Sequence, residues 1–313
     1  MSVLVTGASG LVGRALVDHL LTAPGSNVVA ALRTPVSDWS VPQRQMGDLA
    51  GGEVPAGLLE GIGVVVHLAA RVHVMNETAS DPLQAFRAVN VQGTHALLQA
   101  AAKAGVRRFV FVSSIKVNGE STDAQPFSES DPANPQDPYG QSKWEAEQLV
   151  QSFCEEHSME WVIVRPPLVY GAGVQANFLR LLQALARNRP LPLGALHNHR
   201  SLVALDNLVN FLSLCTSHPA AANELFLISD GHDLTVAELT RKMRAALASR
   251  SWLVPVPACL LSAGLRLLGA SGAAQRLCGE LRVDSRKAQN RLNWQPPASV
   301  DEVIHKTIAA LQR

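Results

Sequence analysis

A tyrosine and a lysine, Tyr139 and Lys143, stand four positions apart in the segment "DPYGQSKWEAE". On a helix this spacing places both side chains on one face, one turn apart. A free tyrosine has a pKa of about 10, and a nearby ammonium group together with an oxidised nicotinamide ring would lower that pKa by stabilising the phenolate. The pair therefore predicts a proton donor and acceptor beside a hydride carrier. The same spacing also occurs on ordinary solvent-facing helices, so further motifs have to decide.

A glycine-rich segment opens the chain. In "TGASGLVG", Gly7, Gly10 and Gly13 lie between a predicted strand and a predicted helix. Glycine allows a tight turn and a close approach of the backbone to a pyrophosphate at the helix N-terminus. A turn that only packs helix against strand is the alternative, but a position at the start of a βαβ series favours dinucleotide binding.

The type of dinucleotide depends on the end of the second predicted strand, where an acidic residue would bind the adenosine ribose. The segment "AALRT" places Arg33 there. Arginine can pair with a 2′-phosphate, which favours NADP(H) over NAD(H) within the NAD(P) class, although Arg33 could also be a solvated loop residue. Asp48 and Leu49 in "GDLAG" are candidates to bracket the adenine, with a plain surface aspartate as the alternative.

Short apolar runs alternate with helical patterns through the first half of the chain, which is typical of βαβ units. We predict strands in "SVLVT", "NVVAAL", "GVVVHLA", "RRFVFVSS" and "MEWVIVRP". After about Pro166 the pattern becomes irregular and rich in proline. We therefore expect an α/β fold with a Rossmann-type doubly wound parallel sheet in residues 1–166, which carries the catalytic residues. A smaller C-terminal α/β substrate-binding lobe is expected in residues 167–313, with some chain returning to the Rossmann domain.

Composition limits the kinds of partner. The 313 residues are 47% hydrophobic and 17% charged, with a formal net charge of +1, so neither nucleic acid nor an acidic membrane is an expected partner and a small molecule is. The four cysteines lie far apart, and the histidines lack acidic or thiol neighbours at ligand spacing, so we expect no metal. The first residues lack a secretory signal pattern, and a cytoplasmic protein is expected.

One late apolar stretch needs separate interpretation. Residues 253–272, "LVPVPACLLSAGLRLLGASG", contain two prolines and Arg266, so they are a poor membrane span. We predict a helix of the substrate lobe, and a helix lying on a membrane surface is the alternative.

Together with "FVFVSSIKVNG", these motifs resemble the extended short-chain dehydrogenase/reductase superfamily, in its NAD-dependent epimerase/dehydratase branch, whose members act on sugar nucleotides. The resemblance covers essentially the whole chain, including "HLAAR", "VNVQGT", "YGQSK", "VRPPLVYG" and "RSLVALDNL". It implies that Tyr139 is the catalytic acid and base, and that Lys143 binds the nicotinamide ribose and lowers the phenol pKa. Ser114 would share the hydrogen bond to the substrate oxygen, and Asn90 would hold a water chain and the active-site backbone. Ser114 could also simply end a strand, and Asn90 could cap a turn.

The motifs and the resemblance together give two sets of ligand contacts. The predicted cofactor-binding residues are Gly7, Ser9, Gly10, Leu11, Val12, Gly13, Arg33, Asp48, Leu49, Leu68, Ala69, Ala70, Arg71, Ser113, Tyr139, Lys143, Pro166 and Pro167. The predicted substrate-binding residues are Ser114, Lys116, Asn177, Phe178, Leu193, Gly194, Arg200 and Arg282. Within this set the resemblance places Asn177 and Arg200 on a nucleotide diphosphate and Leu191–Gly194 against a uracil ring. A solvated arginine is an equal alternative for Arg282.

Departures from the family pattern narrow the reaction. Dehydratases similar to this chain carry an acidic pair directly after the catalytic hydroxyl residue, where Ile115 and Lys116 stand here, so dehydration is not expected. The usual "VYG" reads "VNG", with Asn118 in place of an aromatic residue. The main hypothesis is reduction of a UDP-4-keto-6-deoxy-N-acetylhexosamine for polysaccharide biosynthesis. The alternatives are a UDP-hexose or UDP-N-acetylhexosamine 4-epimerase and a non-catalytic NAD(P)-binding scaffold or sensor.

The expected assembly is a homodimer. The helices that hold Asn90 and Tyr139 carry more apolar residues than one sheet face needs, among them Leu97, Leu98, Leu149 and Phe153. Similar proteins pair these two helices across a four-helix interface.

Overall fold

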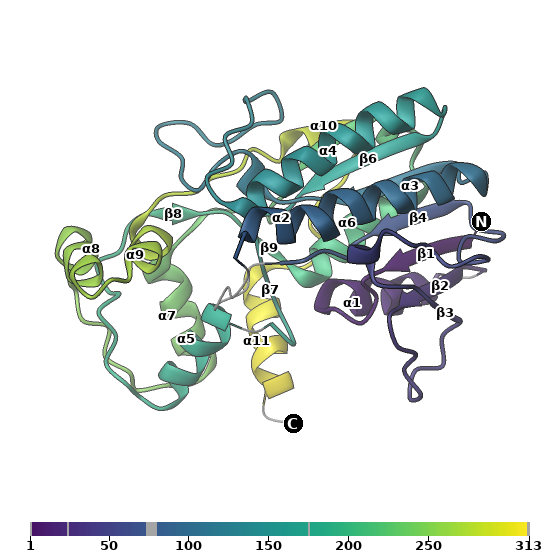
Figure 1. Cartoon of the computed structure of the whole chain (residues 1–313). Helices are drawn as coiled ribbons and strands as arrows, with labels where there is room; N and C mark the ends of the chain where they lie inside the picture. Colours follow the sequence, from purple (N-terminus) through teal and green to yellow (C-terminus); the bar gives the residue numbers. More distant parts are fainter. Residues whose placement is uncertain (1, 24, 73–79, 175, 312–313) are drawn as a thin grey trace.

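A seven-stranded parallel sheet lies at the centre of the molecule (Figure 1). This computed structural model describes residues 2–23, 25–72, 80–174 and 176–311, without the side chains of residues 176, 177 and 271. The strand order is β10-β6-β5-β4-β1-β2-β3. The strands are β1 (Ser2–Thr6), β2 (Asn27–Leu32), β3 (Gln43–Gln45), β4 (Val64–His67), β5 (Arg108–Val112), β6 (Glu160–Arg165) and β10 (Glu224–Leu227). The predicted Rossmann-type fold is confirmed.

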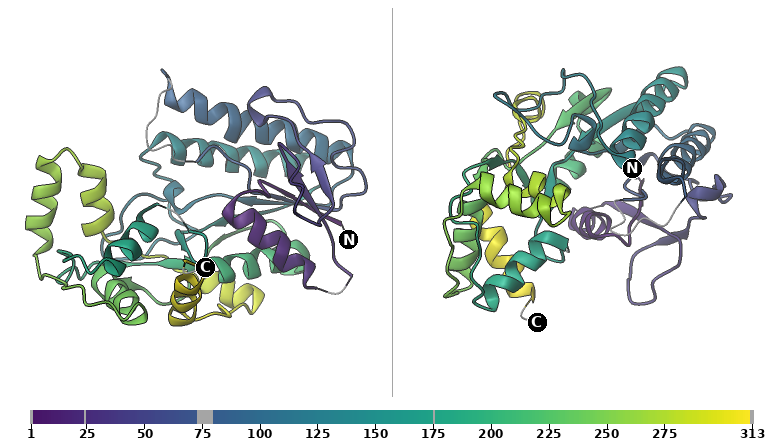
Figure 2. Two further views of the ribbon diagram at one scale, coloured as in Figure 1. Left: turned by 90° about the horizontal axis from the view of Figure 1, so that it is seen from below. Right: turned by 60° about the vertical axis from the view of Figure 1, so that its left-hand side comes forward.

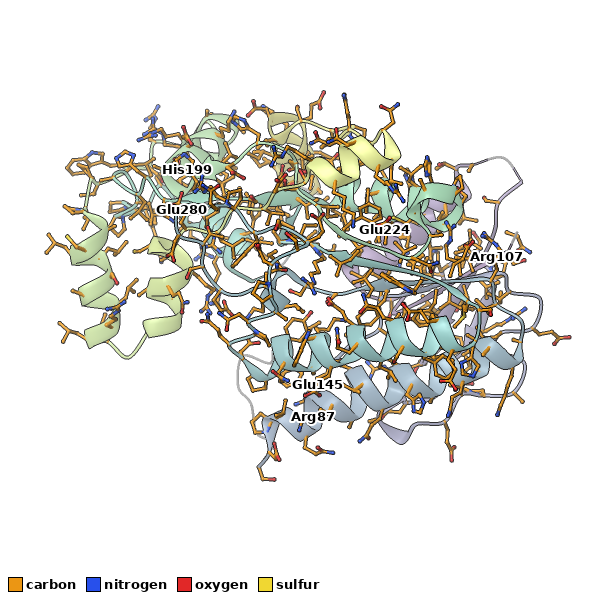
Figure 3. All side chains as sticks on the ribbon, turned by 90° about the horizontal axis from the view of Figure 1, so that it is seen from above. Arg87, Arg107, Glu145, His199, Glu224 and Glu280 are labelled. Atoms are coloured by element: carbon orange, nitrogen blue, oxygen red, sulfur yellow. The ribbon has the colours of Figure 1, made fainter. Side chains whose placement is uncertain are left out.

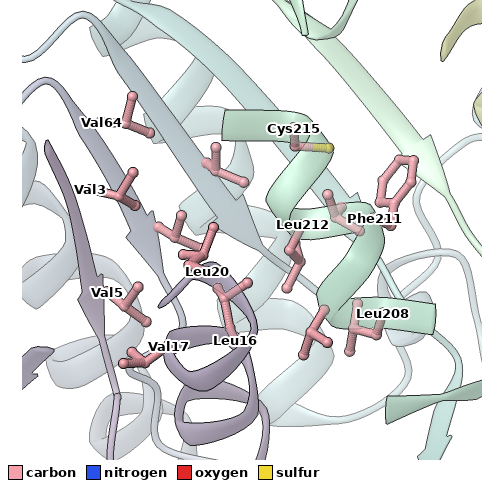
Figure 4. Packing of buried hydrophobic residues seen from close by; sticks show 14 of the residues in the cluster. Val3, Val5, Leu16, Val17, Leu20, Val64, Leu208, Phe211, Leu212 and Cys215 are labelled. Carbon is pink, nitrogen blue, oxygen red and sulfur yellow. The ribbon is translucent and has the colours of Figure 1, made fainter. Parts of the chain in front are cut away.

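Two helical layers cover the sheet, which explains why the middle positions of its central strands are apolar. On one face lie α1 (Leu11–Leu21) and α6 (Leu205–Ser217), and on the other lie α3 (Gly93–Lys103) and α4 (Pro138–Glu156). Figure 4 shows the first interface, where Leu16 and Leu20 of α1 and Leu212 of α6 pack beside Val3 and Val5. Helix α6 and strand β10 therefore bring chain from beyond residue 166 back to the large sheet.

The remaining elements are of two kinds. Some lead into α3 or connect strands of the sheet, and the others build the second lobe. A short helix α2 (Pro82–Arg87) continues through the π-helical turn η2 (Ala88–Gln92) into α3, and η1 (Leu49–Gly51), η3 (Ile115–Val117) and η4 (Pro219–Ala221) are 3₁₀ turns. The lobe, on the left of Figure 1 and turned in Figure 2, holds β7 (Leu168–Tyr170), β8 (His199–Arg200), β9 (Leu202–Ala204), β11 (Leu234–Thr235), α5 (Ala176–Ala186), α7 (Val236–Ala246), α8 (Ala258–Leu267) and α9 (Ser271–Cys278). Helices α10 (Arg286–Leu292) and α11 (Val300–Leu311) complete the described chain. The domain boundary at residue 166 stays a prediction.

The apolar surplus on α3 and α4 has an intramolecular explanation. Leu97 and Leu98 are completely buried, and Phe153 is only 9% exposed, within the core beneath these helices. These side chains cover the sheet of their own chain, so they give no support to the expected dimer. Across the described residues, none of the helices combines the length and the apolar character that crossing a bilayer requires.

Candidate active site

Helix α4 fixes the tyrosine and the lysine at the carboxyl edge of the sheet. Asp137 caps the helix by accepting a hydrogen bond from the amide of Gly140 (2.6 Å), and Pro138 occupies the first turn, where its missing N–H costs nothing. Lys143 is 2% exposed, with Nζ 4.0 Å from the ring centroid of Phe111 on β5. Lys143 therefore faces the sheet, whereas Tyr139 is half-buried, with its ring 5.9 Å from the ring of Phe86 on α2.

The acidity of Tyr139 differs from the sequence-based expectation. Burial raises the pKa of Tyr139 to about 12, the negative charge of Asp137 raises it further, and a hydrogen bond with Ser114 acts in the opposite direction. This direction is opposite to the lowering expected from Lys143, because burial and the charge of Asp137 outweigh the hydrogen bond with Ser114. Ser114 is hydrogen-bonded to the phenol, and its expected hydrogen bond to a substrate oxygen stays a prediction.

A buried charge network lies behind Lys143. Burial lowers the pKa of Lys143 to about 7, and the negative Glu147 one turn further along α4 opposes that shift. Glu147 accepts two hydrogen bonds from Arg165 (2.9 and 2.5 Å), and Arg165 also donates to Oδ1 of Asn118 (2.8 Å). Asn118 in turn donates to the carbonyl of Ser128 (3.1 Å). The asparagine that replaces an aromatic residue thus completes the shell of a buried arginine.

A second buried network starts beside the glycine loop. Oγ1 of Thr6 lies 2.7 Å from Nδ1 of His67, and Nε2 of His67 lies 3.0 Å from Oγ1 of Thr94, which donates to the carbonyl of Asn90 (2.7 Å). Burial lowers the pKa of His67 to about 3, and the charge of Lys143 adds to this, so the ring is neutral. Because Thr94 uses its proton on Asn90, Nε2 must carry the ring proton and Nδ1 must accept from Thr6.

Asn90 continues this chain to the catalytic helix. It lies in the π-helical turn and is 1% exposed. Its side chain exchanges hydrogen bonds with the backbone of Arg71 (2.8 and 3.0 Å) and donates to Oγ of Ser142 (2.9 Å), which donates to the carbonyl of Tyr139 (2.8 Å). Asn90 therefore holds the backbone on both sides of the site, and its role with water stays a prediction.

An ion pair on the outer side fixes the same two helices. Arg87 at the end of α2 meets Glu145 on α4 through two hydrogen bonds (2.8 and 2.6 Å), and Figure 3 shows the two side chains on adjacent helices. The catalytic helix is therefore held to the helix of Asn90 by a buried and by a partly exposed contact.

The glycine loop has the shape that a dinucleotide requires. Gly7 has φ +65°, and a Cβ there would lie 2.7 Å from the amide nitrogen of Ala69. A Cβ at Gly13 would lie 2.2 Å from the carbonyl oxygen of Gly7. Ser9, Gly10 and Leu11 are exposed at the N-terminus of α1, whose first turn contains no acidic residue. This cradle of small residues at a helix N-terminus fits a pyrophosphate.

The other predicted cofactor residues surround that loop. Arg33 follows β2 directly and is exposed, whereas Asp48 accepts from the amide of Ala50 (3.1 Å) and caps η1. Leu49 is 5% exposed and packs against α3, so its side chain is part of the core. Ser113 is 4% exposed, and its Oγ is a buried atom without a hydrogen-bond partner among the described residues. A bound ligand at this edge could satisfy that hydroxyl. Leu68, Ala69, Ala70 and Arg71 follow β4, Val12 lies in the first turn of α1, and Pro166 and Pro167 follow β6.

The predicted substrate residues differ in their surroundings: Lys116 lies in an ion-pair cluster, whereas Phe178 and Leu193 lie in apolar cores. Lys116 forms ion pairs with Glu120 (2.7 Å) and with Asp137, which ties η3 to the start of α4. Phe178 is 5% exposed and Leu193 is 7% exposed, and both belong to cores of the lobe. Their expected side-chain contact with substrate is therefore not supported by their placement. The amide of Gly194 donates to Val254 (3.1 Å), and the side chain of Asn177 lies outside the described residues.

Two arginines of the lobe approach the same segment. Arg200 donates to the carbonyl of Gly279 (3.0 Å), and burial lowers the pKa of its guanidinium, with Glu120 opposing and Arg276 adding to that shift. Arg282 donates to the carbonyls of Asp123 and Ala124 (3.3 and 2.7 Å), so it holds a loop. Arg200 is the better candidate for an anionic group, because it is partly buried close to a second cation. Within the described chain, no three His, Cys, Asp or Glu side chains gather as a metal site.

Sequence reasoning missed the residues that connect the site. Thr6, His67, Thr94 and Ser142 form one chain, and Glu147 with Arg165 forms the other. The spacing of Lys143 and Glu147 was a usable signal, because residues four apart on a helix share a face. The remaining partners are far apart in sequence, and no local pattern marks them.

A Rossmann-type sheet with this tyrosine and lysine at its carboxyl edge defines a short-chain dehydrogenase/reductase. Within that superfamily, the chain belongs to the NAD-dependent epimerase/dehydratase family, whose model matches residues 3–229. It is therefore an NAD(P)-binding enzyme of a family that acts on sugar nucleotides.

Individual relatives carry different reactions. The chain is 41% identical to a UDP-glucose 4-epimerase of Vibrio cholerae, over 99% of this chain and 95% of the relative. It is 33% identical to a dTDP-D-glucose 4,6-dehydratase of Mus musculus, over 98% of this chain and 87% of that relative. Among solved structures, a UDP-glucose 4-epimerase of Thermotoga maritima with UDP-glucose has a TM-score of 0.79 at 22% identity, over 100% and 99%, which shows the fold. A superfamily protein of Agrobacterium tumefaciens with bound NAD has a TM-score of 0.76 at 25% identity, over 100% and 97%.

The glycine loop generates a binding prediction. Gly13→Ala forces a Cβ to 2.2 Å from the Gly7 carbonyl, so the loop must shift and NAD(H) affinity should fall by at least about tenfold. Isothermal titration with NADH and NADPH measures this. The matched control is Gly264→Ala, where the added Cβ meets no atom within 4 Å. Unchanged affinity in Gly13→Ala would exclude the loop from the dinucleotide site.

The buried lysine generates a pH prediction. The pKa of Lys143 falls from 10.5 to about 7 on folding, so the unfolded chain binds the extra proton between these values. The free energy of unfolding should therefore rise with pH across this window, by at most about 1.4 kcal/mol per pH unit, and the contribution should be constant below it. Lys143→Met should lack this rise. Urea unfolding at about pH 7 and about pH 9 measures the difference. Lys103→Met, which removes an exposed lysine of α3, is the control, and equal slopes in all three proteins would contradict the buried charge.

Proposed function

We propose that this enzyme transfers a hydride at C4 of a UDP-hexosamine, and that its main reaction is reduction of a UDP-4-keto-6-deoxy-N-acetylhexosamine for polysaccharide biosynthesis. The observation that carries the hydride chemistry is the hydrogen bond between Tyr139 and Ser114, which follows β5, with Lys143 buried one turn further along α4. A phenol, a hydroxyl and a lysine at the carboxyl edge of a dinucleotide-binding sheet are suited to a carbonyl or an alcohol.

Each residue has a defined part in the proposed reaction. When bound, the nicotinamide cofactor supplies or accepts the hydride. Tyr139 gives its phenolic proton to the C4 oxygen as the ketone becomes an alcohol, and regains a proton from solvent. Ser114 donates a hydrogen bond to the same oxygen, and protonated Lys143 favours the transient phenolate. Arg200 is proposed for the diphosphate, because a guanidinium binds phosphate oxygens bidentately.

Arg33 supports reduction over epimerisation. A 4-keto reductase exchanges its cofactor in each turnover, whereas an epimerase regenerates it, and Arg33 is an exposed cation at the position where an acidic residue would hold the ribose hydroxyls. We therefore propose NADP(H) as the preferred cofactor.

The second candidate is a UDP-hexose or UDP-N-acetylhexosamine 4-epimerase, which uses the same residues at C4. The similarity to the Vibrio cholerae UDP-glucose 4-epimerase over nearly the whole chain favours it as strongly. Dehydration has less support, because Ile115 is buried and Lys116 is an ammonium group already paired with two carboxylates. A dehydratase needs an acid and a base at those positions.

The assembly and the domain division belong to this proposal as well. We propose that residues 1–166 carry the catalytic residues, that residues 167–313 mainly bind the nucleotide sugar, and that the protein forms a homodimer. Sedimentation at micromolar concentration tests the dimer.

A product assay separates the two reactions. We expect the protein to oxidise NADPH stoichiometrically with the UDP-4-keto-6-deoxy sugar, as measured by absorbance of the reduced nicotinamide and by NMR of the product. Interconversion of UDP-N-acetylglucosamine and UDP-N-acetylgalactosamine without added cofactor would identify an epimerase instead. A preference for NADH would assign Arg33 to the solvated surface.

A matched pair of tyrosine variants tests the catalytic assignment. Tyr139→Phe should lower kcat by about 10²- to 10⁴-fold, because the general acid is lost, while NAD(P)H affinity stays within a few-fold. The control is Tyr170→Phe, which alters the other of the two tyrosines, whose hydroxyl donates to Asp230 (2.7 Å) in the lobe. Full activity in Tyr139→Phe would favour the scaffold or sensor hypothesis.

A further inference from the structure

The helix that carries Asn90 meets the catalytic helix at two matched positions. Asn90 donates to Oγ of Ser142 (2.9 Å), and one turn earlier on each helix the ring of Phe86 meets the ring of Tyr139. On each helix the two partners are three or four residues apart, which places them on one face. The first turn of α4 is therefore in contact with α2 through a pair of aromatic rings.

The contact between these rings has the geometry of a favourable aromatic pair. The ring centroids of Phe86 and Tyr139 are 5.9 Å apart, and the ring planes are inclined by 62°, edge to face. Phe86 is 4% exposed, whereas Tyr139 is half-buried. Cζ of Arg71 lies 5.5 Å from the centroid of the Phe86 ring, so a cation also packs on this ring. Phe86 is thus held by its own surroundings and presents a fixed surface to the phenol.

Hydrogen bonds fix both ends of Tyr139 but not the plane of its ring. Ser142 donates to the backbone carbonyl of Tyr139 (2.8 Å), and Ser114 is hydrogen-bonded to the phenol. Rotation of the ring about its long axis moves neither end, and this torsion of a tyrosine is broad when nothing packs against the ring. The phenolic O–H lies close to the ring plane, so the ring plane sets the direction in which the proton leaves. A packed neighbour is needed to hold that plane.

We propose that Phe86 is a positioning residue for the proton transfer: its ring holds the plane of the Tyr139 ring, so that the phenolic O–H points at the substrate oxygen. This role rests on the proposed function of Tyr139 as the general acid, and Phe86 acts only through that residue. Orientation of a reacting group lowers the barrier of the chemical step, whereas binding of substrate and cofactor depends on other residues. A kcat that falls while KM stays constant is therefore the signature of this role.

Two variants of Phe86 separate the ring from the space that it fills. Phe86→Leu keeps most of the apolar volume, and kcat should fall about tenfold because an aliphatic side chain leaves the phenol free to turn. Phe86→Ala should lower kcat about 100-fold. In both variants KM for the sugar nucleotide and the affinity for NADPH should stay within about threefold of the native values. The kcat is measured for the reaction that the product assay identifies, and thermal melting checks that each variant is folded.

The control removes the aromatic ring of another buried phenylalanine. Phe153 on α4 stacks on His157 at a centroid distance of 4.0 Å, near the end of the helix opposite to Tyr139. Phe153→Leu loses a comparable aromatic contact and should keep the native kcat and KM.

A titration without substrate tests the ring contact directly. The chain contains two tyrosines, so Tyr170→Phe leaves Tyr139 as the only phenol. In that background the absorbance of the phenolate should appear at lower pH in Phe86→Ala than in the parent protein. Loss of the Phe86 ring admits water and so weakens the burial that raises the pKa of Tyr139. The other groups that act on this pKa, Asp137 and Ser114, are the same in both proteins.

The outcomes separate the positioning role from the proposed function. Loss of activity in Tyr139→Phe with native kcat in both Phe86 variants would overturn the positioning role alone, and so would a loss of kcat that Phe153→Leu shares. An unchanged phenolate titration in Phe86→Ala would also overturn it. Full activity in Tyr139→Phe would overturn the proposed function and the positioning role together.

Discussion

The active site depends on a hydrogen-bonded chain that only a neutral His67 can complete. It runs from Thr6, directly before the glycine loop, through His67 and Thr94 to Asn90 and from there to the catalytic helix. Each donor and acceptor in it is assigned by its neighbour, so a charged imidazole would leave two protons opposed at Thr6. The pKa of about 3 excludes that state near neutrality. This chain therefore connects strands β1 and β4 to helices α3 and α4, and so links the glycine loop to the helix that carries the phenol.

Two buried cations, Lys143 and Arg165, lie near the same buried carboxylate, that of Glu147. Glu147 is fully paired with Arg165, yet its charge still opposes the loss of the proton from Lys143. Removing one partner of a buried ion pair leaves the other charge buried without compensation, which destabilises the fold. Arg165 and Glu147 therefore have to be retained together. Asn118 accepts a hydrogen bond from the third nitrogen of the Arg165 guanidinium, through an amide oxygen that an aromatic ring lacks. The change from "VYG" to "VNG" therefore adjusts the shell of the catalytic lysine without touching the reacting atoms.

The sequence predicted what depends on local pattern. Apolar runs located five of the seven strands, and the glycine spacing and the tyrosine and lysine spacing indicated the candidate site, because turn geometry and helical periodicity are local. The strand at Gln43–Gln45 has no apolar run and was missed. The π-helical turn at Asn90 was also missed, because it depends on packing against α4. Phe178 and Leu193 were expected to contact substrate but lie in cores, since an apolar residue type does not reveal which side of a lobe it faces. The pKa of Tyr139 lies in the opposite direction from the one expected, because its burial depends on tertiary packing; the other cause, Asp137, is local and stands two residues before it.

Lys116 bears both on the reaction that is not expected of this chain and on the position of helix α4. It stands where similar dehydratases carry an acid, so a proton donor for elimination is lost. Its ammonium group instead bridges Glu120 and Asp137, and Asp137 is the residue that caps α4 and begins the helix of the phenol. The ion pair partly offsets the charge that raises the pKa of Tyr139, while it fixes the first turn. A carboxylate at position 116 would repel Asp137 and strengthen that charge. Lys116 therefore supplies no acid for a dehydration and instead stabilises the start of the helix that carries Tyr139.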